Sequence, residues 1–113
     1  MGFCVFCAIA KGEIPSTTLY EDEQVRAFLD LGPAARGHAL VVPKEHIASV
    51  DGVTAENSSV VAHIFEVIPR IAAGEGLTGG YRVVSNCGDD AGQTVHHLHF
   101  HILGGERLTD SMA

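Results

Sequence analysis

The sequence has few basic residues. Its 113 positions hold seven Lys and Arg against fourteen Asp and Glu, which gives a formal net charge of -7, and the basic residues stand singly along the chain. Polynucleotide binding needs a basic patch or stripe that neutralises phosphates, so this composition excludes a nucleic-acid-binding protein. An anionic ligand would have to be held locally, by backbone N–H groups or protonated histidine.

Cysteines are also few, and the chain lacks a long hydrophobic run. Three cysteines, an odd number, argue against a disulfide framework and indicate a reducing compartment. The apolar opening is too short to span a bilayer and no basic residues precede it, so we expect no membrane segment. The cytoplasm is the expected location.

No internal repeat, low-complexity tract or break in composition divides the chain. Hydrophobic residues make up 46% and charged residues 19%, which excludes a disordered protein and is typical of a folded globular one. We therefore predict a single domain over residues 1–113 with one hydrophobic core.

Short periodic segments separated by turn-forming residues predict an α+β fold. The expected strands are two within residues 18–30 and one each at residues 38–44, 79–86 and 94–103. They should form an antiparallel sheet of about five strands, with the helices on one side.

One long amphipathic helix is predicted over residues 54–73, where apolar residues recur every three or four positions. Thr54 or Asn57 is expected to cap its first turn. Pro69 lacks a backbone N–H and clashes with the preceding turn, so we expect a kink or an early end there. A further short helix is predicted around residues 45–50.

Histidines concentrate near the end of the chain. His97, His99 and His101 alternate with apolar residues, so in a strand they share one face, about 13 Å long, while the apolar residues face the core. Three polar rings on one face need partners that an apolar environment cannot supply, which predicts a functional segment.

Two kinds of chemistry fit this histidine row. Histidines could ligate a catalytic zinc ion with an open coordination position, or one could attack phosphorus and form a phosphoramidate. The spacing alone does not choose between them. Gln93 and Thr94, just before the row, offer an amide and a hydroxyl that suit developing charge on a phosphoryl group.

Cys4 and Cys7 have the C-x2-C spacing of a zinc knuckle, which needs two further ligands. A structural zinc site, a pair of unligated cysteines and a redox pair are all consistent with this spacing. A thioredoxin-like redox pair follows a strand, whereas only three residues precede Cys4. Structural rather than functional roles are expected for Cys87, His63 and His96.

The segment HLHFHIL at residues 97–103 resembles the His-φ-His-φ-His-φ-φ signature of the histidine triad (HIT) nucleotide hydrolases and transferases, where φ is apolar. The resemblance covers nearly the whole chain and is closest to the Hint branch, the nucleoside phosphoramidases. It includes EIP at 13–15, FLDLGP at 28–33, GHALVVPKEHI at 37–47, GQT at 92–94 and the two glycines at 104–105.

This resemblance implies a HIT-like fold, with an antiparallel sheet of about five strands, one long helix and one or two short ones. It also implies a homodimer in which two sheets join, with the long helix and the strand around residues 81–86 at the interface. Such a contact would cover a sheet edge.

The implied activity is hydrolysis of nucleoside phosphoramidates, or of related P–N or P–O linked nucleoside monophosphates, without a catalytic metal. The implied ligand is an AMP-like purine nucleotide. His99 would attack the α-phosphorus and hold a covalent nucleotidyl intermediate, while its second ring nitrogen donates to a backbone carbonyl. Further catalytic contacts are expected from His101, His38, Gln93 and Thr94.

The resemblance also implies a nucleotide-binding set. Asp30 would accept from the ribose hydroxyls and Asn86 would lie beside the phosphoryl group. Apolar residues would wall the base, although the sequence is equally consistent with core packing for them. They are Phe6, Ile9, Ile14, Phe28 and Leu31.

Bacterial members that carry the C-x2-C spacing ligate zinc at positions matching His46 and His97. The resemblance therefore implies a structural zinc site formed by Cys4, Cys7, His46 and His97, which would support folding of the amino-terminal segment rather than the reaction.

Three other functions stay open: a dinucleoside polyphosphate hydrolase, a nucleotide-binding scaffold with weak activity, and a metal-dependent hydrolase that uses the histidine row as ligands. Related nucleotidyl transferases carry glutamine at the third histidine, so His101 disfavours both transfer and loss of function.

Overall fold

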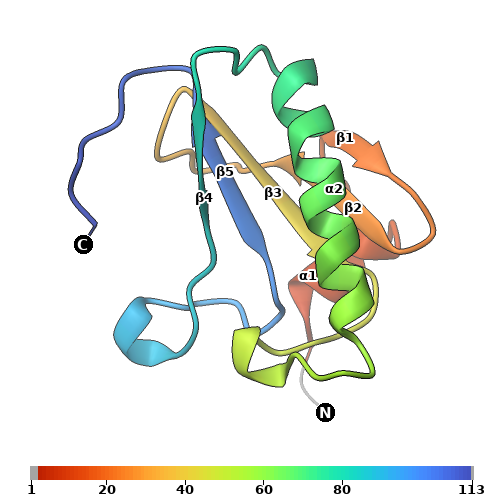
Figure 1. The fold of residues 1–113 in the computed structure, drawn as a ribbon. Helices are drawn as coiled ribbons and strands as arrows, with labels where there is room; N and C mark the ends of the chain where they lie inside the picture. Colours follow the sequence, from red (N-terminus) through yellow and green to blue (C-terminus); the bar gives the residue numbers. More distant parts are fainter. Residues whose placement is uncertain (1–2, 113) are drawn as a thin grey trace.

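The computed structural model describes residues 3–112 and is built on one antiparallel sheet with strand order β1-β2-β3-β5-β4 (Figure 1). The predicted α+β fold, with five antiparallel strands, one long helix and short helices, is confirmed. The strands are β1 (Thr18–Glu21), β2 (Val25–Leu29), β3 (Gly37–Pro43), β4 (Tyr81–Val84) and β5 (Phe100–Gly104). The α-helices are α1 (Val5–Ala10) and α2 (Ser58–Gly74), and 3-10 helices occur at Val50–Gly52 and Asp89–Ala91.

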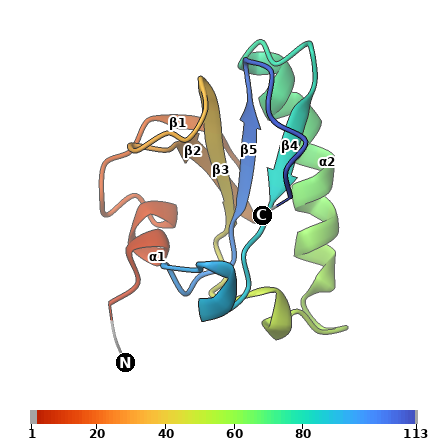
Figure 2. The same cartoon turned by 90° about the vertical axis from the view of Figure 1, so that its left-hand side faces the viewer.

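The two α-helices cover opposite faces of the sheet (Figure 2). The prediction that helices lie on one side was wrong. The strand β3 carries apolar residues on both faces and is buried almost throughout, so both faces need a cover. Val41 packs in the larger cluster with α2, and its neighbours Leu40 and Val42 pack in a smaller cluster with α1.

The helix α2 begins at Ser58, later than predicted, and continues through Pro69. Pro69 is exposed on the solvent side of the helix. Because it has no N–H, one carbonyl in the preceding turn lacks its helical partner, and that carbonyl also lies on the solvent side. The predicted early end of the helix does not occur. Asn57 is the N-cap residue, but its Oδ1 accepts from the Thr54 N–H at 2.7 Å instead of from the helix.

Two other predictions of local structure were wrong. The helix expected around residues 45–50 is absent there, and a 3-10 helix begins instead at Val50. The strand expected over residues 94–103 begins only at Phe100, so His97 and His99 lie in the segment that leads into β5. The apolar residues that alternate with the histidines are buried under α2, as predicted.

No helix within residues 3–112 combines the length and apolar character needed to cross a membrane.

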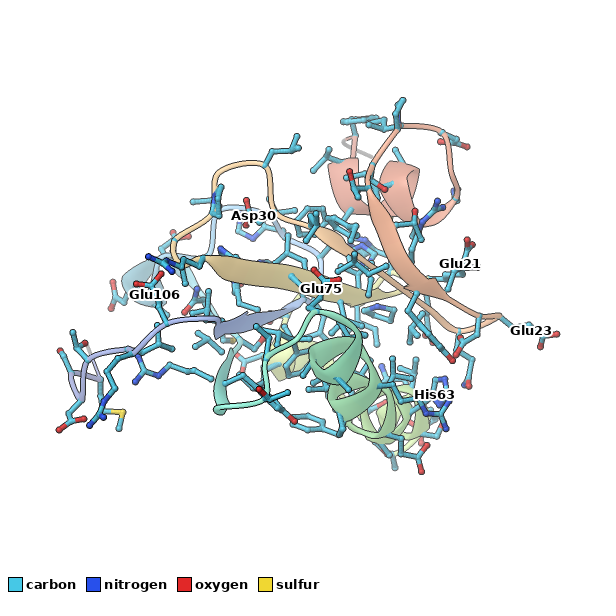
Figure 3. The ribbon with its side chains drawn as sticks, turned by 90° about the horizontal axis from the view of Figure 1, so that it is seen from above. Glu21, Glu23, Asp30, His63, Glu75 and Glu106 are labelled. Atoms are coloured by element: carbon cyan, nitrogen blue, oxygen red, sulfur yellow. The ribbon has the colours of Figure 1, made fainter. Side chains whose placement is uncertain are left out.

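A cluster of polar side chains ties α2 to the turn between β1 and β2. His63 on α2 (Figure 3) places Nε2 2.6 Å from Asp22 Oδ2, and the Tyr20 hydroxyl donates to the same oxygen at 2.9 Å. Although burial alone would raise it, hydrogen bonds from His63 and from backbone N–H groups hold the pKa of Asp22 well below its usual value. The bond to Asp22 raises the pKa of His63.

We expect His63→Gln to lower the free energy of unfolding more at about pH 5.5 than at about pH 9. The pKa of His63 is higher in the folded than in the unfolded protein, so the charged His63–Asp22 pair stabilises the fold below the unfolded pKa of His63. This stabilisation is about 1 kcal/mol, and it is lost as the pH rises through the folded pKa of His63. The Asp22 contribution is lost only in acid, as pH falls below the unfolded value of about 4. Urea unfolding at both pH values measures the difference.

The matched control is His96→Gln, at an exposed histidine, which we expect to cost little stability at either pH value. A cost of His63→Gln that is the same at both pH values would contradict the charged pair.

Candidate active site and metal site

His97 belongs to both functional clusters. It is 0% exposed, and its Nε2–H donates to the Pro43 carbonyl at 2.8 Å. This bond fixes the tautomer, so Nδ1 keeps a lone pair. Burial lowers the pKa of His97, which is therefore neutral near pH 7. A neutral imidazole with one unprotonated nitrogen is the form that ligates metals.

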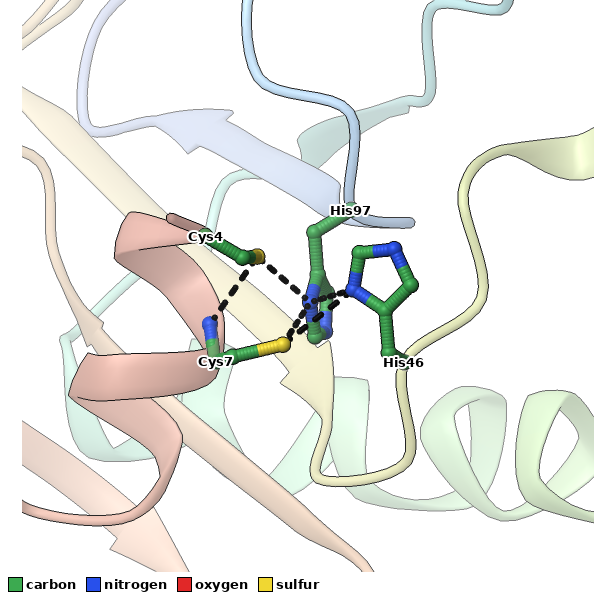
Figure 4. A group of neighbouring side chains, drawn as sticks. All are labelled: Cys4, Cys7, His46 and His97. Atoms are coloured by element: carbon green, nitrogen blue, oxygen red, sulfur yellow. Dashed lines mark hydrogen bonds between the residues drawn. The ribbon is translucent and has the colours of Figure 1, made fainter. Parts of the chain in front are cut away.

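Three other side chains lie around that nitrogen (Figure 4). The Sγ atoms of Cys4 and Cys7 each lie 3.3 Å from His97 Nδ1, and His46 Nδ1 lies 3.2 Å from it. All four donor atoms fall within 4.8 Å of one another. The set predicted from the sequence is thus brought together, and we call it the Cys2His2 cluster.

Different parts of the chain supply the Cys2His2 cluster. Cys4 is the N-cap of α1 and its sulfur accepts from the Cys7 N–H at 3.3 Å, so one helical turn presents both thiols. His46 lies in the loop after β3. That loop is fastened to the histidine segment because the Leu98 N–H donates to the Ile47 carbonyl at 2.6 Å.

The chemistry of these donors fits a metal ion. Burial, together with the hydrogen bond to Cys4, raises the pKa of the Cys7 thiol to about 11, so the Cys7 thiol stays protonated unless a cation compensates the charge of its thiolate. Zinc favours tetrahedral sets of thiolates and imidazoles with bonds of about 2.0–2.3 Å, which separate the donor atoms by about 3.5 Å. Cys4, Cys7, His46 and His97 could therefore form a metal site.

A second cluster joins Asp30, His38 and His101, whose nearest donor atoms also lie within 4.8 Å. His38 Nδ1 accepts from the Ala34 N–H at 2.9 Å, so in the neutral ring the proton is on Nε2. That nitrogen is 2.8 Å from His101 Nδ1 and 3.4 Å from Asp30 Oδ2. Because a metal ligand needs an unprotonated nitrogen, this cluster is arranged for hydrogen bonding rather than for a metal.

The same bond sets the tautomer of His101. Its Nδ1 accepts from the His38 Nε2–H, so in the neutral ring the proton of His101 is on Nε2. Burial, and then the neighbouring His99 and His38, lower the pKa of His101 to about 4. At pH 7 His101 is therefore a neutral N–H donor, of the kind that binds a phosphoryl oxygen.

His99 has the opposite arrangement. It is 6% exposed, and its Nδ1–H donates to the His97 carbonyl at 2.6 Å, as the family resemblance implies. The lone pair is therefore on Nε2, the nitrogen that can attack an electrophile. The His101 ring lies 5.0 Å away between ring centres, and the Ser85 hydroxyl donates to the His99 carbonyl at 2.8 Å.

Strand register explains why the histidines meet. In the antiparallel pair of β3 and β5, His38 lies opposite Leu103 and Leu40 lies opposite His101. Residues opposite one another point to the same face, so His38 and His101 are diagonal neighbours. That face is the one that α1 covers, because Leu40 packs in the α1 cluster.

The apolar residues expected to wall a base fall into two groups. Phe6, Ile9 and Phe28 are buried in the cluster under α1, and Ile14 packs against it. Leu31 is 94% exposed in the loop after β2. The first group is therefore held by packing whether or not a ligand binds, whereas packing does not explain an apolar side chain at position 31.

The amide of Gln93 is engaged with the backbone. Its Nε2 donates to the carbonyls of Ala48 and Val95 at 2.8 and 3.0 Å, and its Oε1 accepts from the Gly88 N–H at 2.9 Å. Gln93 is buried, so these bonds hold the loop that follows β4.

The other two polar residues predicted to contact the phosphoryl group differ in exposure. Thr94 is exposed and lines a hollow of about 420 Å³ with Cys4 and His46. Asn86, just after β4, is half-buried.

Three supporting groups were not predicted. They are the Pro43 carbonyl, the Ala34 N–H and the Ser85 hydroxyl, which bond His97, His38 and the backbone of His99. Two of them are backbone groups: every residue has a carbonyl, and every residue except proline has an N–H. Residue type therefore gives no signal for them in the sequence. Ser85 precedes Asn86, but a lone serine at a strand end is too common to single out.

Comparison with known proteins now identifies the family. The model of the HIT domain family matches residues 11–108, so the chain belongs to the HIT family. An uncharacterized HIT-like protein of Synechococcus elongatus is 47% identical over 104 residues, which cover 92% of this chain and 91% of that protein.

Two solved structures have the same fold. A HIT family hydrolase from Clostridium thermocellum has a TM-score of 0.96 and 45% identity, covering 100% of this chain and 99% of that one. A histidine triad nucleotide-binding protein from Candida albicans has a TM-score of 0.81 and 31% identity, covering 98% and 87%. These matches support a HIT family hydrolase.

Proposed function

We propose that this HIT family hydrolase cleaves nucleoside phosphoramidates, or related P–N or P–O linked nucleoside monophosphates, through a covalent nucleotidyl intermediate on His99. The observation that carries the proposal is the 2.6 Å hydrogen bond from His99 Nδ1 to the His97 carbonyl. It leaves the lone pair on Nε2, beside the neutral donor His101. The Candida albicans relative, described as nucleotide-binding, supports a nucleotide ligand.

In the first step His99 Nε2 attacks the α-phosphorus. A bond forms between that nitrogen and phosphorus, the bond from phosphorus to the leaving amine breaks, and the departing amine takes up one proton from solvent water. The resulting imidazolium is stabilised by the bond from Nδ1–H to the His97 carbonyl. The His101 Nε2–H binds the phosphoryl oxygens, where charge accumulates.

In the second step water attacks the phosphorus of the intermediate. The bond from phosphorus to His99 Nε2 breaks and the nucleoside monophosphate leaves. The imidazole is neutral again with its proton still on Nδ1, and the attacking water releases one proton to solvent, which balances the proton taken up in the first step. The sum is hydrolysis of a P–N bond with one water. Two easier displacements replace one difficult displacement, and every group used belongs to the chain.

The nucleotide would lie along the face that α1 covers. Asp30 suits the ribose hydroxyls, because its Oδ1 already accepts from the Gly32 N–H at 2.8 Å, which orients the carboxylate. Exposed Leu31 would cover the base of an AMP-like purine nucleotide. The remaining contacts are proposed for the phosphoryl group (His38, Asn86 and Thr94) and for the base (Phe6, Ile9, Ile14 and Phe28). Gln93 would hold the loop beside the phosphoryl group through its bonds to backbone carbonyls.

We infer that the ion of the Cys2His2 cluster is zinc, because two thiols and two imidazoles suit zinc better than a hard cation. When bound, zinc would supply a structural crosslink that joins α1 to the loop after β3 and to His97. It would take no part in either displacement.

Thiol ligands persist in a reducing compartment, so we propose that the protein is located in the cytoplasm. Fractionation of the source cells tests this location.

We also propose a homodimer. The strand β4 is at one edge of the sheet, and Tyr81 on it is 39% exposed. Pairing of two β4 edges around a twofold axis would satisfy free backbone groups and join two sheets into one. Sedimentation velocity at micromolar concentration measures the assembly, and a monomer there would contradict it.

The experiment that tests the proposed reaction is to trap the intermediate. During turnover of an adenosine phosphoramidate, a rapid alkaline quench followed by peptide mass analysis should find the mass of one adenylyl group on His99. Turnover of the phosphoramidate should exceed that of a dinucleoside polyphosphate. An adduct on another residue, or none during steady turnover, would overturn the proposal.

A further inference from the structure

The helix α1 is short and depends on its attachments. At six residues it is well below the length at which a helix is stable alone, so tertiary contacts must hold it. At its end the Arg26 side chain donates to the Ile9 carbonyl at 3.0 Å. At its start Cys4 and Cys7 fasten it to His97, so the orientation of its first turn depends on the Cys2His2 cluster.

Phe6 lies between these two cysteines and contacts the proposed nucleophile. Its ring centre is 4.9 Å from that of His99, at an interplanar angle of 82°. It also makes edge contacts with Phe28 at 5.6 Å and with His97 at 6.3 Å. Phe6 is 8% exposed, so this position is enclosed by packing.

His99 therefore has two restraints, and both lead to the Cys2His2 cluster. The His97 carbonyl holds Nδ1 of His99, while Nδ1 of His97 faces the thiols. Phe6 limits the tilt of the His99 ring about that hydrogen bond, and Phe6 sits in the turn that carries both thiols. One hydrogen bond alone leaves an imidazole free to tilt, whereas a ring packed against it removes that freedom.

We propose that Phe6 is a positioning residue that holds the His99 imidazole in its attacking orientation, and that the Cys2His2 cluster holds Phe6 in place through α1. This inference rests on the proposed function of His99. Misplacement of a reacting group by about 1 Å can lower a rate by about 100-fold, so a loose ring would lower kcat. The rate of the reaction would then depend on whether the Cys2His2 cluster holds its metal, although that metal takes no part in the chemistry.

The first test is Phe6→Leu in the zinc-loaded protein, with Phe3→Leu as the matched control at a 79% exposed position on the same segment. We expect Phe6→Leu to lower kcat about tenfold or more, a larger effect than the rise in KM that loss of its proposed base contact gives. If Phe6 acts only on the base of the nucleotide, KM rises instead and kcat is kept, which overturns the inference. Phe6→Met, which keeps more of the volume, is measured in the same way if Phe6→Leu does not fold.

The second test reads the ring directly. Nitrogen-15 NMR of histidine at fixed pH reports the tautomer and mobility of His99 without turnover. We expect Phe6→Leu and removal of metal by a chelator each to broaden or shift the His99 signals, whereas Phe3→Leu leaves them in place. Applied together, the two changes should give less than the sum of their effects, because they act through the same helix. Unchanged His99 signals in Phe6→Leu would overturn the inference.

The two proposals fail in different ways. If His99→Ala keeps full activity, the nucleophile is wrong and the proposed function fails. If His99→Ala is inactive while Phe6→Leu has normal kcat and normal His99 signals, the function stands and the positioning role fails.

Discussion

Replacement of His99 by Ala is expected to lower kcat by about 10⁴-fold or more on a nucleoside phosphoramidate, because the variant lacks the nitrogen on which the proposed covalent intermediate forms. Binding of the nucleotide product should change little, since the proposed contacts to ribose and base come from other side chains. His99 is 6% exposed, so the variant leaves a cavity, but its backbone keeps the bond from Ser85. Steady-state kinetics and calorimetric titration with AMP separate the two effects.

The matched control is His96→Ala, three positions before His99 and exposed. It should keep nearly full activity. Retention of activity in His99→Ala, or an equal loss in His96→Ala, would contradict the role given to His99.

The second large effect concerns stability. Replacing Cys7 with Ser removes the sulfur that lies 3.1 Å from His46 Nδ1 and 3.3 Å from His97 Nδ1, and it is expected to abolish tight zinc binding. We expect the free energy of unfolding to fall by about 3 kcal/mol, which lowers the melting temperature by roughly 10–20 °C for a domain of this size. Calorimetry and metal analysis of purified protein provide the measurement.

Cys87→Ser is the matched control, because the Cys87 sulfur contacts only the Ser49 hydroxyl among the hydrogen bonds found in residues 3–112, at 3.5 Å. It should keep its metal and most of its stability. A chelator should lower the melting temperature of the wild-type protein but not that of Cys7→Ser. Equal melting temperatures for Cys7→Ser and Cys87→Ser would contradict a structural metal site.

The sequence predicts those parts of the site that depend on the type and spacing of side chains. The alternation around His99 and the C-x2-C pair of Cys4 and Cys7 depend on side-chain chemistry at fixed spacing, and the metal-site ligands do come together. The same alternation misled the prediction of structure, because His97 and His99 alternate with apolar residues and yet lie outside the strand. Hydrogen bonds to the Pro43 and Ile47 region, not a strand ladder, hold that segment.

The position of α1 shows a second limit of the sequence. Six residues are too few to reveal a helical period, and the cover on the second face is signalled only by a strand, β3, that is apolar on both sides. The role of Phe6 also cannot be predicted from the sequence. A phenylalanine buried in a core and a phenylalanine packed against a catalytic ring are both simply apolar residues in the sequence.

The hydrogen-bond chain through His38 and His101 begins at the backbone N–H of Ala34. A peptide group rather than a side chain thus decides which nitrogen of the last imidazole carries its proton. Position 34 can accept almost any amino acid during evolution without altering that proton arrangement. Proline is the exception, because it alone has no N–H to donate.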